Sequence, residues 1–134
     1  MAQVVTQQPA FEQYNCQIVA VSFGPRYWAD VWVQETGFSP LLLDLNRKAY
    51  HAYGLKSSWL HAHSAKNLWY YAKAKVQGKK TYGDRGDPNQ MGGDFIVGHD
   101  GRLRLVHPSQ DPTDRPDVAA LLAVLAAYHD RPTK

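Results

Sequence analysis

The fold is decided by residues 17–43, QIVAVSFGPRYWADVWVQETGFSPLLL, which predict a strand, a helix and a second strand in succession. The run from 17 to 23 is apolar and β-branched, has no helical spacing, and ends at Gly24. Pro25 can open a helix that carries an apolar stripe, and Gly37 is a suitable C-cap for it. A continuous apolar strand of this kind is typical of a parallel sheet that is covered on both faces.

The same alternation of elements continues downstream. A short strand at 41–43 is followed by a helix from Arg47 to Tyr53 that Gly54 closes. Residues 94–97 and 102–106 flank an Asp-Gly turn and predict a β-hairpin, and an apolar stripe of helical spacing then predicts a C-terminal helix. This order of strands and helices indicates an α/β domain.

Residues 57–80, SSWLHAHSAKNLWYYAKAKVQGKK, predict an amphipathic helix rich in aromatic residues. Its rings, which include Trp69, can cover the sheet or meet a partner, because aromatic residues are enriched in interface cores. Its lysines, from Lys66 to Lys80, can follow a phosphate backbone, but a charged helix face is more often simply solvated. We therefore do not expect a nucleic-acid partner.

Length and composition favour one soluble domain, residues 1–134, with loose ends at 1–10 and 130–134. No stretch approaches the roughly 20 apolar residues of a membrane helix, so no membrane contact is expected. The N-terminus lacks the pattern of a signal peptide, which makes a cytoplasmic location the default. The net charge of +3 is only mildly basic and identifies no class of partner.

The chain contains one cysteine, Cys16, so an internal disulfide and a Cys-x-x-Cys pair are excluded within it. Cys16 leads into a strand and not into a helix, so no helix N-terminus stabilises its thiolate. Its neighbours Tyr14, Asn15 and Gln17 carry no charge. These features favour a structural cysteine, although a reactive thiol stays open as the alternative.

Two stretches carry a family resemblance. They are residues 18–55, with Glu-Thr-Gly and Tyr-x-x-x-Gly-Leu, and residues 91–125, with Gly-Gly-Asp-Phe, Asp-Gly-Arg and Asp-Pro-x-Asp in order. Together they resemble peroxiredoxin-like proteins of the AhpC/TSA, or redoxin, class. The resemblance implies an α/β thioredoxin-like fold, here truncated at the N-terminus, with an inserted aromatic-rich helix and a closing β-hairpin plus helix. The family's initial strand and its Cys-x-x-Cys helix have no counterpart in this sequence.

That departure has a consequence for the sheet. In the resembled fold the initial strand lies in the middle of the sheet, so the strand at 17–23 would lose a neighbour and need other partners for its main chain. Residues 3–6 could supply a substitute strand, the strand could pair directly with the hairpin, or it could pair with another chain. We expect an oligomer, most simply a homodimer, or a complex with another protein chain.

A possible pocket is predicted where the resembled fold brings a loop close to its active site. Met91, Gly92 and Gly93 occupy that place, and they can line a pocket with Asp94 and Trp59.

Metal binding is a weaker hypothesis. Two histidines, His61 and His63, could form a nitrogen site with His51, but surface histidines are the favoured interpretation. We predict no metal and no cofactor.

The favoured function is therefore a redoxin-family domain that lacks the catalytic cysteine motif and acts as a non-catalytic, self-associating or partner-binding module. The alternative is a thiol-dependent antioxidant enzyme, a peroxidase or reductase, that uses Cys16 or a cysteine motif from another chain. Enzymatic activity stays open, and the chain by itself is predicted to have none.

Overall fold

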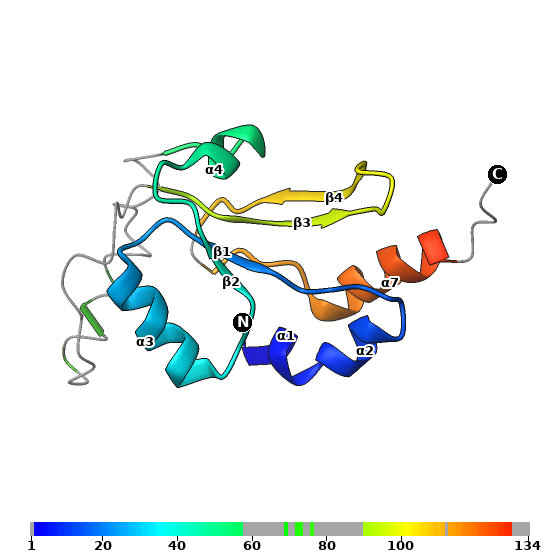
Figure 1. Ribbon diagram of the computed structural model, residues 1–134, viewed down its shortest axis with the longest axis horizontal. Helices are drawn as coiled ribbons and strands as arrows, with labels where there is room; N and C mark the ends of the chain where they lie inside the picture. Colours follow the sequence, from blue (N-terminus) through cyan, green and yellow to red (C-terminus); the bar gives the residue numbers. More distant parts are fainter. Residues whose placement is uncertain are drawn as a thin grey trace.

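The structure is a computed structural model that describes residues 2–57, 69, 72–73, 76, 90–111 and 113–129. Its helices and strands mix along the chain, which is compatible with the predicted α/β thioredoxin-like class (Figure 1). In chain order they are α1 (Ala2–Thr6), α2 (Gln8–Glu12), β1 (Ala20–Ser22), α3 (Arg26–Thr36), β2 (Leu41–Leu43), α4 (Lys48–Ala52), β3 (Gly93–Val97), β4 (Leu103–Pro108) and α7 (Val118–His129).

The predicted strand–helix–strand unit is confirmed. β1 pairs with β2 in parallel, with Ala20 beside Leu41 and Ser22 beside Leu43. α3 connects them and ends at Gly37, whose φ of 66° lies in the left-handed region that glycine adopts without strain. The Gly37 N–H donates to the carbonyl of Val33 at 2.8 Å, so the helix closes as its sequence predicts.

The hairpin is also confirmed. β3 and β4 pair antiparallel, with Asp94 opposite His107 and Ile96 opposite Leu105. A register shift follows Ile96, and the chain reverses direction in a turn that contains Gly101, whose φ is 76°. The predicted C-terminal helix corresponds to α7, which packs against both β4 and α2.

The N-terminal segment that the sequence predicts to be loose, residues 1–10, is mostly helical where it is described. Residues 2–12 form α1 and α2, and α2 has Pro9 in its first turn, where a missing N–H costs nothing. Phe11 anchors the segment, since only 4% of its surface is exposed. The suggested substitute strand at residues 3–6 is therefore helical.

Direct pairing of the first strand with the hairpin is likewise not observed. The described strands form two separate sheets, one of β1 with β2 and the other of β3 with β4. Figure 1 shows β1 and the hairpin as distinct ribbons within one molecule. Among the described strands, β1 thus has β2 as its sole partner.

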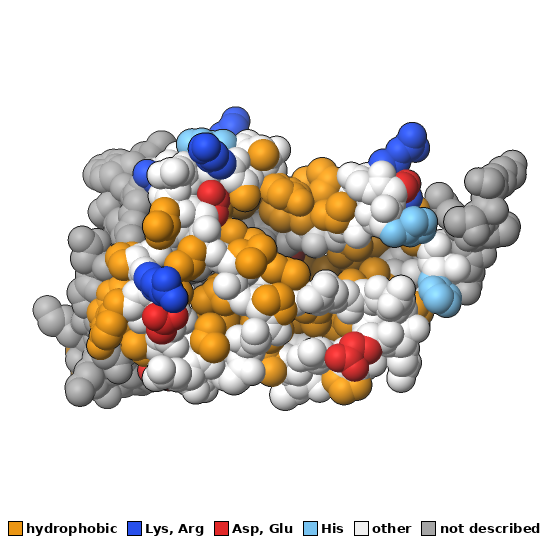
Figure 2. Space-filling model, in the orientation of Figure 1, with side chains coloured by type: hydrophobic (Ala, Val, Ile, Leu, Met, Phe, Trp, Pro, Cys, Tyr) orange, Lys and Arg blue, Asp and Glu red, His pale blue; other side chains and the backbone are white. Residues whose placement is uncertain are grey.

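The prediction that both faces of the first strand are covered is wrong. The buried apolar residues among those described are Phe11, Ala29, Phe38, Leu55 and Leu121. Val21 of β1 and its neighbour Leu42 of β2 are instead 41% and 55% exposed. Figure 2 shows hydrophobic side chains gathered on this face of the molecule, over the β1–β2 pair and over the hairpin.

Most of the predicted aromatic helix at 57–80 lies outside the described residues, as do His61, His63 and residues 130–134. Trp69, Ala72, Lys73 and Val76 are described and helical, and the Lys73 ammonium lies 5.2 Å from the centre of the Trp69 ring. The helix as a whole stays a prediction. Across the described residues, no helix combines the length and the apolar character needed to cross a bilayer.

Candidate functional site

The predicted pocket residues Met91, Gly92, Gly93 and Asp94 meet at the start of β3, whereas Trp59 lies outside the described residues. The carboxylate of Asp94 is engaged, because Arg115 Nη1 donates to its Oδ2 at 2.9 Å. This ion pair ties the segment before α7 to the hairpin.

The two glycines at this place differ in the space around them. A Cβ on Gly93 would lie 2.8 Å from the His107 carbonyl oxygen and 2.9 Å from carbons of Leu55 and Phe95. A Cβ on Gly92 would meet only Arg115 Nη2, at an ordinary 3.6 Å. Leu55, in the segment after α4, can therefore approach the hairpin this closely because residue 93 has no side chain.

The segment before β3 is held by hydrogen bonds to Lys56, in the segment that follows α4. Gln90 Nε2 donates to the carbonyls of Met91 at 3.0 Å and Lys56 at 3.4 Å, and the Met91 N–H donates to Lys56 at 3.2 Å. Arg47 Nη1 reaches Gln90 Oε1 at 3.5 Å. These contacts make the start of β3 a joint between elements, and no free reactive group is identified there among the described residues.

Tyr50, in α4, contacts the β1–β2 pair. Its hydroxyl donates to the carbonyl of Val21 at 3.1 Å, and its ring meets Phe23 edge to face, with 5.2 Å between ring centres. Burial raises the pKa of the phenol, the positive charge of Arg115 opposes that rise, and the Asp44 carboxylate adds to it. Tyr50 is therefore protonated at neutral pH and acts as a hydrogen-bond donor.

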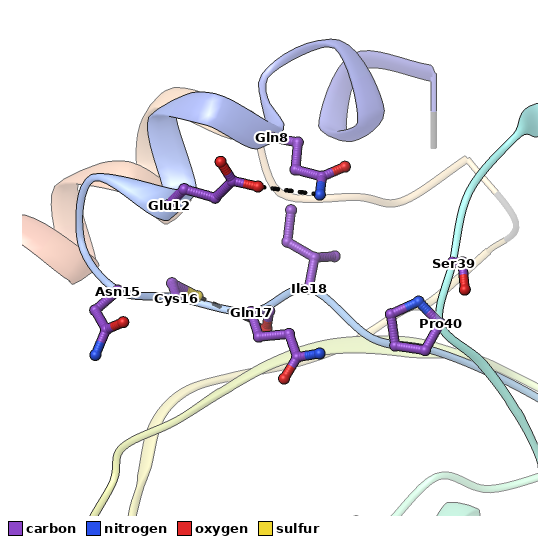
Figure 3. Close-up of a pocket in the computed structure, with 8 residues that line it drawn as sticks. All are labelled: Gln8, Glu12, Asn15, Cys16, Gln17, Ile18, Ser39 and Pro40. Carbon is purple, nitrogen blue, oxygen red and sulfur yellow. Dashed lines mark hydrogen bonds between the residues drawn. The ribbon is translucent and has the colours of Figure 1, made fainter.

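The alternative catalytic candidate, Cys16, lies elsewhere, in an open pocket of about 340 Å³ (Figure 3). The chain turns out of α2 through Asn15, whose φ of 53° is left-handed, and then runs extended toward β1. Figure 3 shows Ile18 pointing from this extended chain toward Gln8 of α2. The lining residues are Gln8, Glu12, Asn15, Cys16, Gln17, Ile18, Ser39 and Pro40.

The pocket does not activate the thiol. Burial raises the pKa of Cys16, which favours the neutral thiol over the thiolate. The one charged lining group is the carboxylate of Glu12, which accepts a hydrogen bond from Gln8 Nε2 at 3.2 Å, and none of the eight lining residues is Lys, Arg or His. Cys16 Sγ contacts only the carbonyl of Gln17, at 3.9 Å, among the polar groups described. A thiolate here would have neither a cation nor a helix N-terminus beside it.

The sequence missed this pocket because α2 was not expected. The four-residue spacing of Gln8 and Glu12 and the apolar Phe11 between them are helical signals in retrospect. The left-handed turn at Asn15, which brings Cys16 under α2, has only a weak signal, namely the tolerance of asparagine for that conformation.

A metal centre is not formed by the described residues, since no three of their His, Cys, Asp and Glu side chains cluster suitably. Of the three histidines considered, only His51 is described, and it lies in the last turn of α4.

The comparisons with known proteins agree with the resemblance in the sequence. The family model described as AhpC/TSA antioxidant enzyme matches residues 3–111. A search of curated proteins and a search of solved structures found no significant match.

Proposed function

The chain belongs to the AhpC/TSA antioxidant enzyme family, and we propose that within this family it is a non-catalytic module that acts by associating with a second copy of itself. The observation that carries the proposal is the environment of Cys16, the single cysteine of the chain. Thiol chemistry in such a chain would depend on that residue alone.

The surroundings of Cys16 oppose thiolate formation. Its pKa is raised by burial, and the nearest charged lining group, Glu12, is negative. The residue follows a helix and leads into an extended chain, so the partial positive charge of a helix N-terminus does not act on it. A thiol of this kind reacts slowly with peroxide, because the thiolate is the nucleophile.

Self-association is supported by the exposed apolar surface around β1. A two-stranded sheet is marginal by itself, and parallel strands are normally buried on both faces. The β1–β2 pair has an exposed apolar face and no third strand among those described. Contact with another polypeptide would remove this surface from water.

Time-resolved intact mass in a slight excess of hydrogen peroxide tests the non-catalytic half of the proposal. Cys16→Ser is the control variant. We expect the mass of the wild-type chain to stay unchanged over many minutes. Added oxygen within seconds on the wild type, absent from Cys16→Ser, would make Cys16 a peroxidatic thiol and overturn the proposal.

A thiol-dependent antioxidant enzyme is the second candidate, and one observation favours it. Cys16 lines an open pocket, so a small peroxide can reach its sulfur. In that reaction the thiol loses its proton, the thiolate sulfur attacks one peroxide oxygen, and the O–O bond breaks to give sulfenic acid and hydroxide, which takes up the released proton to become water. Peroxidase activity that survives Cys16→Ser and requires a second polypeptide would instead indicate a cysteine motif supplied by another chain.

A further inference from the structure

One edge of β1 has no partner strand among the described strands, and the hydrogen bonds to β2 show which residues face it. The Ala20 N–H donates to the Pro40 carbonyl at 3.1 Å, and the Asp44 N–H donates to the Ser22 carbonyl at 2.7 Å. In a parallel ladder, alternate residues direct their N–H and C=O groups to the same side. Ala20 and Ser22 therefore face β2, whereas Val21 directs its main-chain groups to the opposite side, which we call the outer edge.

The outer edge continues into the chain that precedes β1. Figure 1 shows this segment extended between α2 and β1. The main chains of Ile18 and Val19 make no hydrogen bond with any described residue, and the Gln17 carbonyl has only the 3.9 Å contact with Cys16 Sγ. Within residues 17–21, the main-chain groups of Gln17, Val19 and Val21 that face away from β2 have no main-chain hydrogen bond to a described residue, which makes this edge a template for another strand.

The usual protections of an edge strand are missing from this segment. Native sheets block open edges with lysine, proline, inward-pointing charges or a bulge. Residues 16–24 contain no charged residue and no proline, and residues 41–43 of the neighbouring strand are three leucines. Val19 and Val21 are 44% and 41% exposed, so apolar side chains flank this edge.

One group at the outer edge already has a partner. The carbonyl of Val21 accepts the Tyr50 hydroxyl, and the rings of Tyr50 and Phe23 lie together there. A carbonyl oxygen has two lone pairs, so it can still accept an N–H. The phenol marks where the open edge ends, on the C-terminal side of Val21.

We infer that the outer edge, residues 17–21, pairs with the same edge of a second copy of this chain. The pairing is antiparallel about a two-fold axis at Val19, so that Val19 lies opposite itself and Gln17 lies opposite Val21 of the second copy. If the alternation of β1 continues through the extended chain before it, Val19 and Gln17 direct their main-chain groups to the same side as Val21, so these groups meet their complements, and the Val21 carbonyl is shared with Tyr50. The two β1–β2 pairs then form one continuous sheet. This inference names the surface used by the self-association proposed above and rests on that proposal.

The neutral composition of the outer edge is compatible with a second copy as the occupant. The net charge of +3 opposes self-association through any charged surface, but the segment that would meet its own copy is neutral. A strongly acidic or basic partner would find no complementary charge on residues 16–24. A two-fold interface needs a self-complementary patch, and an unpaired strand edge is one.

Sedimentation velocity at micromolar concentrations tests both the self-association of the chain and the surface through which it occurs. Val19→Lys brings two ammonium groups together at the axis, and we expect it to weaken the dimer by about tenfold or more. Val106→Lys is the matched control, because Val106 on β4 is 56% exposed and lies off this edge. We expect it to remain as dimeric as the wild type.

The outcomes separate the two claims. A wild-type chain that is monomeric at these concentrations would overturn the proposed self-association and the surface together. A dimer that Val19→Lys leaves intact would preserve self-association and overturn the surface.

Disulfide trapping keeps the surface testable if the lysine variant does not fold. In a Cys16→Ser background, Val19→Cys places two cysteines about 5.5 Å apart between Cα atoms, within the range that a disulfide spans. Mild oxidation is expected to give a covalent dimer by intact mass. Val106→Cys in the same background is the control. Position 106 is more exposed than position 19, but it lies away from the outer edge, so the variant should cross-link less. Equal or greater cross-linking at position 106 would contradict the pairing.

Discussion

The hydroxyl of Tyr50 donates a hydrogen bond to the main-chain carbonyl of Val21, with 3.1 Å between the two oxygens. The bond joins α4 to the outer edge of β1, across 29 residues of sequence. It gives one edge group a partner within the chain and leaves the preceding residues open. The same side chain therefore supports the β1–β2 pair and sets the limit of its unpaired edge.

Tyr50→Phe should destabilise the fold by about 1 kcal/mol, because it removes this bond and leaves the ring in place. Urea unfolding followed by fluorescence gives the change in the free energy of unfolding. Tyr53→Phe is the control, since the Tyr53 ring packs against Phe95 and its hydroxyl has no hydrogen-bond partner among the described residues. Equal stability of the two variants would show that the Tyr50 bond contributes nothing.

Gly93→Ala should cost about 1–3 kcal/mol, because a methyl group there overlaps main-chain and side-chain atoms of the hairpin and of Leu55. Gly92→Ala should be nearly neutral, since its new carbon meets one guanidinium nitrogen at an ordinary distance. Thermal unfolding of the two variants side by side measures the contrast. A neutral Gly93→Ala would mean that the close approach of Leu55 to the hairpin is not required.

Asp114 should make the fold sensitive to acid. Its carboxylate accepts the Gln110 N–H at 2.7 Å and contacts His107 Nε2 at 3.0 Å, and these bonds lower its pKa, the main-chain bond most. A pKa that is lower in the folded state stabilises the protein above the unfolded value of about 3.9. That contribution is lost as the pH falls through the folded value.

Asp114→Asn should therefore be less stable than the wild type at neutral pH, with the difference shrinking below about pH 4. Urea midpoints measured from pH 2.5 to 6.5 give this profile. Asp30→Asn is the control, because that exposed carboxylate has only a 3.8 Å contact with Arg26. A difference that stays constant with pH would contradict the role of the Asp114 carboxylate.

Local signals in the sequence predicted much of the fold. Gly37 takes a left-handed conformation at the end of a helix, and Gly101 takes one in the turn of the hairpin. Both the helix end and the turn were predicted from residue type and position alone. The family was also predicted correctly from the order of its short motifs. These features depend on neighbours in sequence, so one sequence is enough to find them.

What the sequence did not predict depends on contacts between distant segments. Continuous apolar residues at 17–23 predicted a strand covered on both faces, yet Val21 is substantially exposed, because periodicity reports what a strand could bury and not what lies beside it. The pocket at Cys16 requires α2 to fold back over the chain through Asn15. The predicted pocket residues at the start of β3 meet as expected, but Asp94 is held by Arg115, which no local pattern indicates.

Amide-resolved hydrogen exchange at several protein concentrations tests the central claim most directly. Self-association through the outer edge predicts that the Gln17, Val19 and Val21 amides exchange more slowly as concentration rises, since these N–H groups gain partners only in the dimer. The Ala20 amide, already bonded to Pro40, should change much less. Exchange at residues 17, 19 and 21 that is fast and independent of concentration would contradict the account.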